Sequence, residues 1–135
     1  MEIRRDKYLD LLIHSCGNGL IKVITGMRRC GKSYLLFTLF KNYLIKQGVK
    51  EDHIIGVNLE NRLNKSLRDP DALLQYIDSR LASDGQYYVM LDEVQMVSEF
   101  EDVLNSFLSI SNVDVFVTGS NAKFLSKDVI TEFRG

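Results

Sequence analysis

Residues 23–36 read VITGMRRCGKSYLL, and this stretch decides the fold. It begins with β-branched apolar residues, breaks at Gly26, collects three cations and continues as a leucine-rich run. Residues 26–33, GMRRCGKS, match the pattern G-x-x-x-x-G-K-[ST] between a predicted strand and a predicted helix, the context that a phosphate-binding loop requires. A chain of this length matches the bare pattern by chance on the order of once in a few hundred cases. We therefore interpret residues 26–33 as a phosphate-binding loop rather than a chance match.

Each residue type in this loop has a physical role in holding a phosphate. Gly26 lets the chain leave the strand sharply, and Gly31 permits close approach of the backbone. The amides that follow form an anion-binding nest at a helix N-terminus. Lys32 supplies a positive charge to the outer phosphates, and Ser33 offers a hydroxyl to Mg²⁺. The predicted nucleotide-binding residues are Gly26, Met27, Arg28, Arg29, Cys30, Gly31, Lys32, Ser33 and Tyr34.

The two arginines of the loop have more than one interpretation. Arg28 and Arg29 lie in the middle of the loop. Three roles are open to them: to face solvent, to contact a neighbouring subunit, or to assist phosphate binding. The sequence leaves these alternatives open.

The composition indicates one globular domain, which we expect to span residues 1–135. Hydrophobic residues make up 45% of the chain and charged residues 26%, so neither disorder nor a fibrous repeat is indicated. The net charge of -1 predicts no general attraction to nucleic acid, since proteins that bind polyanions usually carry a basic excess.

The ends and the cysteines bear on the cellular compartment. The N-terminus lacks the apolar core of a signal peptide, and no apolar stretch approaches the length that spans a bilayer. We therefore expect a cytoplasmic protein without a membrane segment, in which Cys16 and Cys30 remain free thiols. His14 and His53 have no Cys or carboxylate at ligand spacing, so a metal cage made of protein ligands alone is not expected.

Strands and helices are predicted to alternate along the chain. Such alternation predicts an α/β fold in which helices cover both faces of a parallel sheet, with ligands at the carboxyl ends of the strands. Mostly apolar segments rich in β-branched and aromatic residues predict strands at 20–26, 53–60, 87–93 and 113–120. Helices are expected over 32–47 with Gly48 as the stop, from Pro70 with Asp69 as cap, from Ser98 with Glu101 as its capping-box partner, and more weakly after Asn121.

An apolar strand that ends in two carboxylates supplies the second part of the site. Residues 87–95 read YYVMLDEVQ, and a buried carboxylate needs a partner because its desolvation is unfavourable by several kcal/mol. Asp92 is the candidate to hold Mg²⁺ opposite Ser33, and Glu93 is placed to activate a water for in-line attack. The alternative is that the two acids close the strand as solvated charges.

A third apolar strand ends in small polar residues, within FVTGSNAKF at 116–124. Thr118, Ser120 or Asn121 is a candidate to orient the attacking water or to touch the terminal phosphate, provided that this strand lies between the other two. We take Ser120 and Asn121 as the catalytic candidates, with a helix cap as the alternative for Asn121.

Together, GMRRCGKS, VMLDEVQ and VTGSN resemble the prokaryotic AAA-superfamily P-loop ATPases of the AAA_14 type. The resemblance covers nearly the whole chain and implies a three-layer P-loop NTPase fold with sheet order 5-1-4-3-2. It makes Lys32 and Ser33 the Walker A pair, Asp92 and Glu93 the Walker B pair, and the turn at 118–121 the first sensor.

The same resemblance places the fifth strand after the point where this chain stops, at EFRG. We therefore expect a truncated domain that lacks this strand and leaves residues 20–26 as an exposed apolar edge. Such an edge is a site for pairing with a second copy.

The leading functional hypothesis is Mg-dependent ATP hydrolysis coupled to a conformational switch, with ATP as ligand. A nucleotide-gated binding module with little turnover and a P-loop kinase acting on a small molecule are the alternatives. A GTPase is disfavoured, since no Asn-Lys-x-Asp motif is present. A role linked to DNA follows only from the family analogy.

Overall fold

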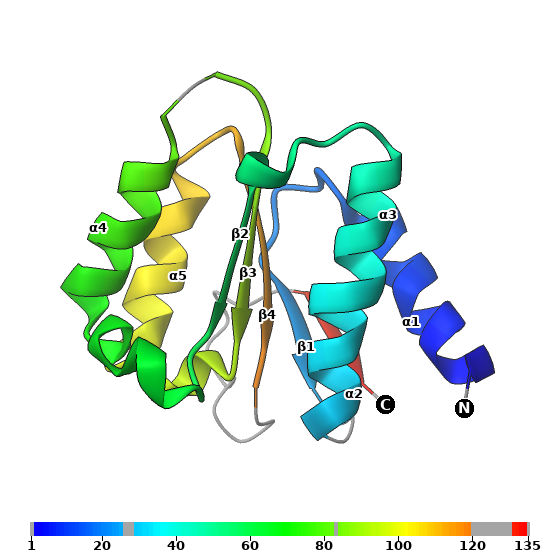
Figure 1. The fold of residues 1–135 in the computed structure, drawn as a ribbon, viewed down its shortest axis with the longest axis horizontal. Helices are drawn as coiled ribbons and strands as arrows, with labels where there is room; N and C mark the ends of the chain where they lie inside the picture. The colour runs from blue at the N-terminus through cyan, green and yellow to red at the C-terminus, as the bar shows by residue number, and fades with distance from the viewer. Residues whose placement is uncertain (1, 26–28, 83, 120–130, 135) are drawn as a thin grey trace.

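A parallel five-stranded sheet with helices on both faces forms the centre of the molecule in this computed structural model (Figure 1). The structure describes residues 2–25, 29–82, 84–119 and 131–134. The strands are β1 (Lys22–Thr25), β2 (Ile54–Asn58), β3 (Tyr87–Asp92), β4 (Val113–Thr118) and β5 (Thr131–Arg134). Their order is β2-β3-β4-β1-β5, which confirms the predicted 5-1-4-3-2 arrangement and all four strands predicted from composition.

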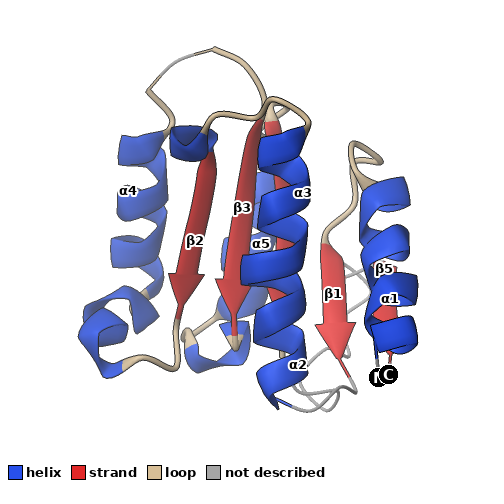
Figure 2. Cartoon of the chain, turned by 45° about the vertical axis from the view of Figure 1, so that its right-hand side comes forward, coloured by secondary structure: helices blue, strands red, loops and turns tan. Residues whose placement is uncertain are grey.

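The fifth strand corrects one expectation. We expected the chain to lack it, but β5 pairs in parallel with β1 and places Thr131 beside Lys22 and Arg134 beside Thr25. Figure 2 shows β2 and β5 at opposite ends of the sheet. The exposed edge expected at 20–26 is therefore wrong, because β1 is paired on both sides, and the argument for self-association loses its basis.

Side chains along each strand point alternately to the two faces of the sheet, and both faces are covered by helices, which explains why the strands are apolar throughout. In β3, Val89 and Leu91 belong to the core beneath α4 (Pro70–Arg80) and α5 (Phe100–Leu108). Met90 faces the second core, which α1 (Glu2–Ser15) and the helical run after β1 cover. Both faces are buried, so both sets of side chains are apolar.

The helix that follows β1 is not uniform. It comprises α2 (Arg29–Tyr34), a π-helical segment η1 (Leu35–Phe40) and α3 (Lys41–Lys46). Backbone angles at the two junctions, Tyr34 and Phe40, are right-handed helical, so the three pieces form one continuous rod (Figure 1). The helix predicted over 32–47 is confirmed, with Gly48 at φ 99° after its end. Short 3₁₀ turns complete the described helices: η2 (Glu51–His53), η3 (Arg62–Arg68) and η4 (Val94–Met96).

The predicted helix caps had mixed outcomes. Asp69 caps α4 by accepting a hydrogen bond of 3.0 Å from the Ala72 N–H, as expected. The capping box of Ser98 and Glu101 is wrong, because α5 starts at Phe100 after Glu99 in the left-handed region at φ 55°. The Ser98 N–H instead donates to the Arg68 carbonyl. The helix expected after Asn121 falls outside the described residues.

A buried ion pair lies near the start of β1 and β4. Lys22 is fully buried and pairs with Asp114, whose other oxygen accepts the Gly17 N–H at 2.8 Å. Burial, together with the negative charge of Asp114, raises the pKa of the nearby Cys16 thiol to about 11. Cys16 is a free thiol, as expected. Among the residues that the structure describes, no helix has both the length and the apolar character to cross a membrane.

Candidate nucleotide-binding site

The site forms where the carboxyl ends of β1, β3 and β4 meet the start of α2 (Figure 1). β4 lies between β1 and β3, which is the condition set above for its end to take part. The sheet therefore brings residues 32–33, 92–93 and 118–119 to one edge, although they are far apart in sequence.

Asp92 is buried, with an exposed fraction of 2%, and two hydroxyl groups satisfy its carboxylate. Ser33 Oγ donates to Asp92 Oδ2 at 2.6 Å, and Thr118 Oγ1 donates to Asp92 Oδ1 at 2.5 Å. These bonds compensate much of the desolvation of the charge. The burial of Asp92 thus does not by itself require a metal, contrary to the sequence argument.

Lys32 lies between the ends of β3 and β4. Its Nζ donates to the Gly119 carbonyl at 3.1 Å and lies 3.6 Å from Glu93 Oε2. The Gly119 N–H in turn donates to the Ile24 carbonyl of β1 at 3.2 Å. The side chains of Lys32 and Glu93 are only 9% and 13% exposed, so their attraction is screened less than that of a surface pair.

Glu93 adopts an uncommon backbone conformation. Its φ of 55° and ψ of 53° are left-handed, which is unfavourable by about 1–2 kcal/mol for a residue with a Cβ. Its N–H donates to Thr118 Oγ1 at 2.9 Å, and its Oε1 accepts from Gln95 Nε2 at 2.7 Å. Backbone strain of this kind concentrates at functional sites.

The remaining predicted site residues are placed as follows. Gly31 is buried in α2, and Tyr34 at its end is 43% exposed. The backbone of Arg29 and Cys30 forms the first turn of α2. The predicted residues Gly26, Met27, Arg28, Ser120 and Asn121 fall outside the described residues, as do the side chains of Arg29 and Cys30.

The oxygen atoms of Ser33 and Asp92 fit Mg²⁺. Magnesium prefers hard oxygen ligands and is commonly held by one or two protein groups together with phosphate oxygens and waters. Within the described part of the chain, no group of three or more His, Cys, Asp or Glu side chains forms a metal cage. Ser33 Oγ and Asp92 Oδ2 lie 2.6 Å apart. This pair suits a metal ion whose other ligands are phosphate oxygens and waters.

Sequence reasoning missed several contacts in this site. Thr118 was considered for orienting water or touching the terminal phosphate, whereas its hydroxyl lies between the Glu93 N–H and the Asp92 carboxylate. Gln95 and the Gly119 carbonyl were not singled out at all, although both lie in the quoted segments. The position of Gln95, two residues after Glu93 in the sequence, was the available signal that its side chain could reach the Glu93 carboxylate.

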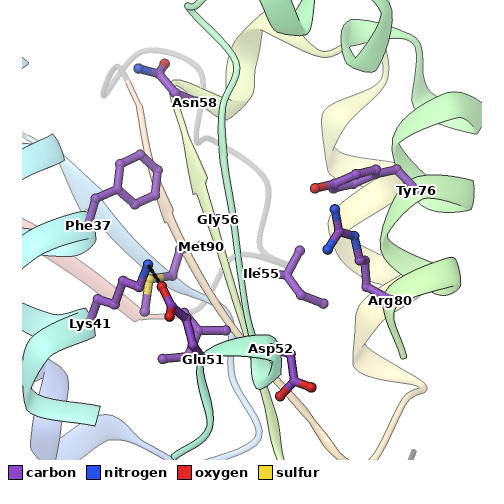
Figure 3. Close-up of a pocket in the computed structure, with 11 residues that line it drawn as sticks. Phe37, Lys41, Glu51, Asp52, Ile55, Gly56, Asn58, Tyr76, Arg80 and Met90 are labelled. Atoms are coloured by element: carbon purple, nitrogen blue, oxygen red, sulfur yellow. Dashed lines mark hydrogen bonds and ion pairs between the residues drawn. The ribbon is translucent and has the colours of Figure 1, made fainter. Parts of the chain in front are cut away.

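A second hollow lies elsewhere, at the edge strand β2. Its volume is about 420 Å³, and Figure 3 shows Phe37 and Lys41 on one side of β2 and Tyr76 and Arg80 on the other, with Gly56 between them. None of the predicted site residues that the structure describes lines it. This hollow is therefore separate from the site at the end of the sheet.

Fold and site together define a nucleotide-binding P-loop domain of the AAA type. A family model for an AAA domain, AAA_14, matches residues 18–135, and the chain belongs to this family.

Two relatives are uncharacterized proteins. One, from Haemophilus influenzae, is 34% identical over 134 residues, covering 98% of this chain and 33% of its own length. The other, from Methanocaldococcus jannaschii, is 32% identical over 117 residues, covering 85% of this chain and 24% of its own length. The chain thus spans a third or less of these curated relatives.

A solved structure shares the fold. It is a chain from the structure of Drosophila ORC bound to AT-rich DNA and Cdc6, with a TM-score of 0.55 and 11% sequence identity. The match covers 87% of this chain and 46% of that one. At this identity the similarity extends to the fold alone.

Proposed function

We propose that this chain binds ATP together with Mg²⁺ at the carboxyl ends of β1, β3 and β4 and hydrolyses it to ADP and phosphate. The observation that carries this proposal is the contact of Ser33 with Asp92, 59 residues apart, beside the pair of Lys32 and Glu93. Structural ion pairs do not require a hydroxyl, a carboxylate, an ammonium group and a second carboxylate at the end of a phosphate-loop motif. Phosphoryl transfer to water uses all four.

Each group has a distinct role in this reaction. Lys32 binds the outer phosphate oxygens, and Ser33 and Asp92 would hold the metal. When bound, Mg²⁺ neutralises negative charge that develops on the phosphate oxygens. Glu93 accepts a proton from the attacking water, whose oxygen forms the new bond to phosphorus while the bond to the ADP oxygen breaks. Ser120 and Asn121 remain our candidates to orient that water.

The contacts of Lys32 suggest how ligand binding would change the conformation. In this structure the Lys32 ammonium group donates a hydrogen bond to the Gly119 carbonyl and forms an ion pair with Glu93. Phosphate oxygens compete with Glu93 for the same charge. Binding ATP would therefore release Glu93 from Lys32, and loss of the terminal phosphate would restore the pair.

The experiment is Glu93→Gln, with Glu99→Gln as the matched control. Both acids have φ of 55°, but Glu99 is an exposed residue before α5. We expect Glu93→Gln to lower the turnover of Mg-ATP by about 10²- to 10⁴-fold, because a positioned base is lost. ATP affinity should be retained, and Glu99→Gln should behave as the unaltered protein. Phosphate release measures turnover, and calorimetry measures ATP affinity.

Other outcomes would support the alternatives. Tight ATP binding with no turnover in the unaltered protein would indicate a nucleotide-gated module. Phosphate release that requires an added acceptor would indicate a kinase. We further propose that residues 1–135 form the ATP-binding domain, and that it works in the cytoplasm.

A further inference from the structure

Gln95 contacts the proposed general base and is the last residue of the segment VMLDEVQ, but the sequence predicted no role for it. It lies in η4, two residues after Glu93, and its Nε2 donates to Glu93 Oε1 at 2.7 Å. A carboxylate has no proton to donate, so the amide nitrogen of Gln95 must face it. The orientation of the amide is therefore fixed by chemistry.

Within the described part of the chain, the oxygen of the same amide has no hydrogen-bond partner. Gln95 Oε1 is buried, and no donor among the described residues reaches it. Buried polar atoms are paired in the great majority of cases, and an exception calls for an explanation. Among the described residues, the amide bonds to Glu93 through its nitrogen and finds no donor for its oxygen, so the Glu93 contact accounts for its placement.

Three contacts together determine where the Glu93 carboxylate lies. The backbone N–H is bound by Thr118, Oε1 is bound by Gln95, and Oε2 lies 3.6 Å from Lys32 Nζ. The contact with Lys32 is the one that a phosphate would disrupt, as argued above. The Gln95 contact does not involve Lys32 and can persist when that pair separates.

We propose that Gln95 is the positioning residue for Glu93, which it holds by Oε1 so that Oε2 is the oxygen that takes the proton from water. This inference rests on the proposed hydrolysis. Without Gln95 the carboxylate can rotate about its side-chain bonds, and misplacement of a reacting group by about 1 Å lowers rates by about 10²-fold.

The test is Gln95→Met, which keeps the length of the side chain and removes its N–H donor. We expect kcat for Mg-ATP hydrolysis to fall by about 10- to 100-fold, while KM and the affinity for ATP change less than about twofold. Stability should not fall, because the variant also removes from the interior an Oε1 that no donor among the described residues reaches. Gln75→Met, at an exposed glutamine of α4, is the matched control and should leave all these quantities unchanged.

A second variant separates positioning from packing. Gln95→His restores a ring N–H at about the reach of the amide nitrogen, so kcat should recover at least partly relative to Gln95→Met. A merely structural role predicts instead that kcat, ATP affinity and melting temperature fall together in Gln95→Met, and that result would overturn the proposal. Unchanged kcat in Gln95→Met, with an active unaltered protein, would overturn the role of Gln95 alone. Absence of turnover in the unaltered protein would overturn the hydrolysis itself.

Discussion

Thr118 links two acids that follow one another in the sequence. Its hydroxyl accepts the Glu93 N–H at 2.9 Å and donates its own proton to Asp92 at 2.5 Å. A hydroxyl is both donor and acceptor, which suits it to this position between a backbone amide and a carboxylate. The left-handed backbone of Glu93 is therefore tied to the end of β4.

We predict that Thr118→Val lowers the free energy of unfolding by about 1–3 kcal/mol, because two buried polar groups lose their partner while the shape is kept. Urea denaturation measures the change, and Thr118→Ser should retain most of the stability. Thr38→Val, at a partly buried threonine of η1, is the control. A loss below about 0.5 kcal/mol in Thr118→Val would mean that water replaces the hydroxyl at no penalty.

At the level of single residues, the sequence predicted which groups meet but not how they contact one another. Lys32, Ser33, Asp92 and Glu93 were selected because their spacing and their strand ends match phosphate chemistry, and the structure brings all four together. The bond from Thr118 to Asp92 depends on β4 lying beside β3, which composition and periodicity do not specify. Contacts across neighbouring strands become predictable only after the strand order is known.

The loop after α1 is fixed to the sheet by the buried pair at the opposite end of the strands. Asp114 of β4 binds Lys22 of β1 and accepts the Gly17 N–H, so one carboxylate joins two strands and a loop. Lys22 Nζ also lies 4.8 Å from the centre of the Phe116 ring, a cation–π contact. The ion pair of Lys22 and Asp114 thus connects β1 and β4 near the start of both strands.

We predict that Asp114→Ala lowers the free energy of unfolding by about 3–5 kcal/mol, because Lys22 would remain buried without its counter-ion. Adding Lys22→Met to that variant should recover part of the loss, since the unpaired charge is then removed. Asp78→Ala, at an exposed position of α4, should change stability by less than about 0.5 kcal/mol. Equal losses in Asp114→Ala and Asp78→Ala would contradict the role assigned to the pair.

At the scale of elements, the helices and strands with clear local sequence patterns were the ones predicted correctly. Strands buried on both faces and the helix capped by Asp69 were predicted because apolar patterns and cap chemistry act locally. The strand β5 was missed because TEFR has no apolar run, and an edge strand is held mainly by backbone bonds on one side. The prediction of a capping box at α5 failed because the Ser98 N–H donates to the carbonyl of Arg68, which lies 30 residues earlier in the chain.

At the scale of the whole molecule, ligand binding should appear as added stability. A ligand that binds only the folded chain stabilises it by mass action, by about 2.7 kcal/mol at a concentration of 100 Kd. We predict that Mg-ATP raises the melting temperature by roughly 10 °C at that concentration. Lys32→Ala should abolish the rise, and Lys41→Ala, at the first residue of α3 in the same helical rod, should retain it.

An equal rise in the protein and in Lys32→Ala would refute the assignment of the loop. Differential scanning fluorimetry with and without Mg²⁺ provides the measurement, and it requires no turnover. The result is therefore independent of the catalytic role of Glu93.

The strand order has a consequence for how the chain is made. Lys22 of β1 pairs with Phe116 and Thr131, residues that the ribosome adds 94 and 109 positions later. At elongation rates of about 5–20 residues per second, β1 waits roughly 5–20 s for its neighbours. During that interval, the strand leading into the phosphate loop has no partner on either flank. An unpaired strand of this kind can pair with another chain until β4 and β5 have been made.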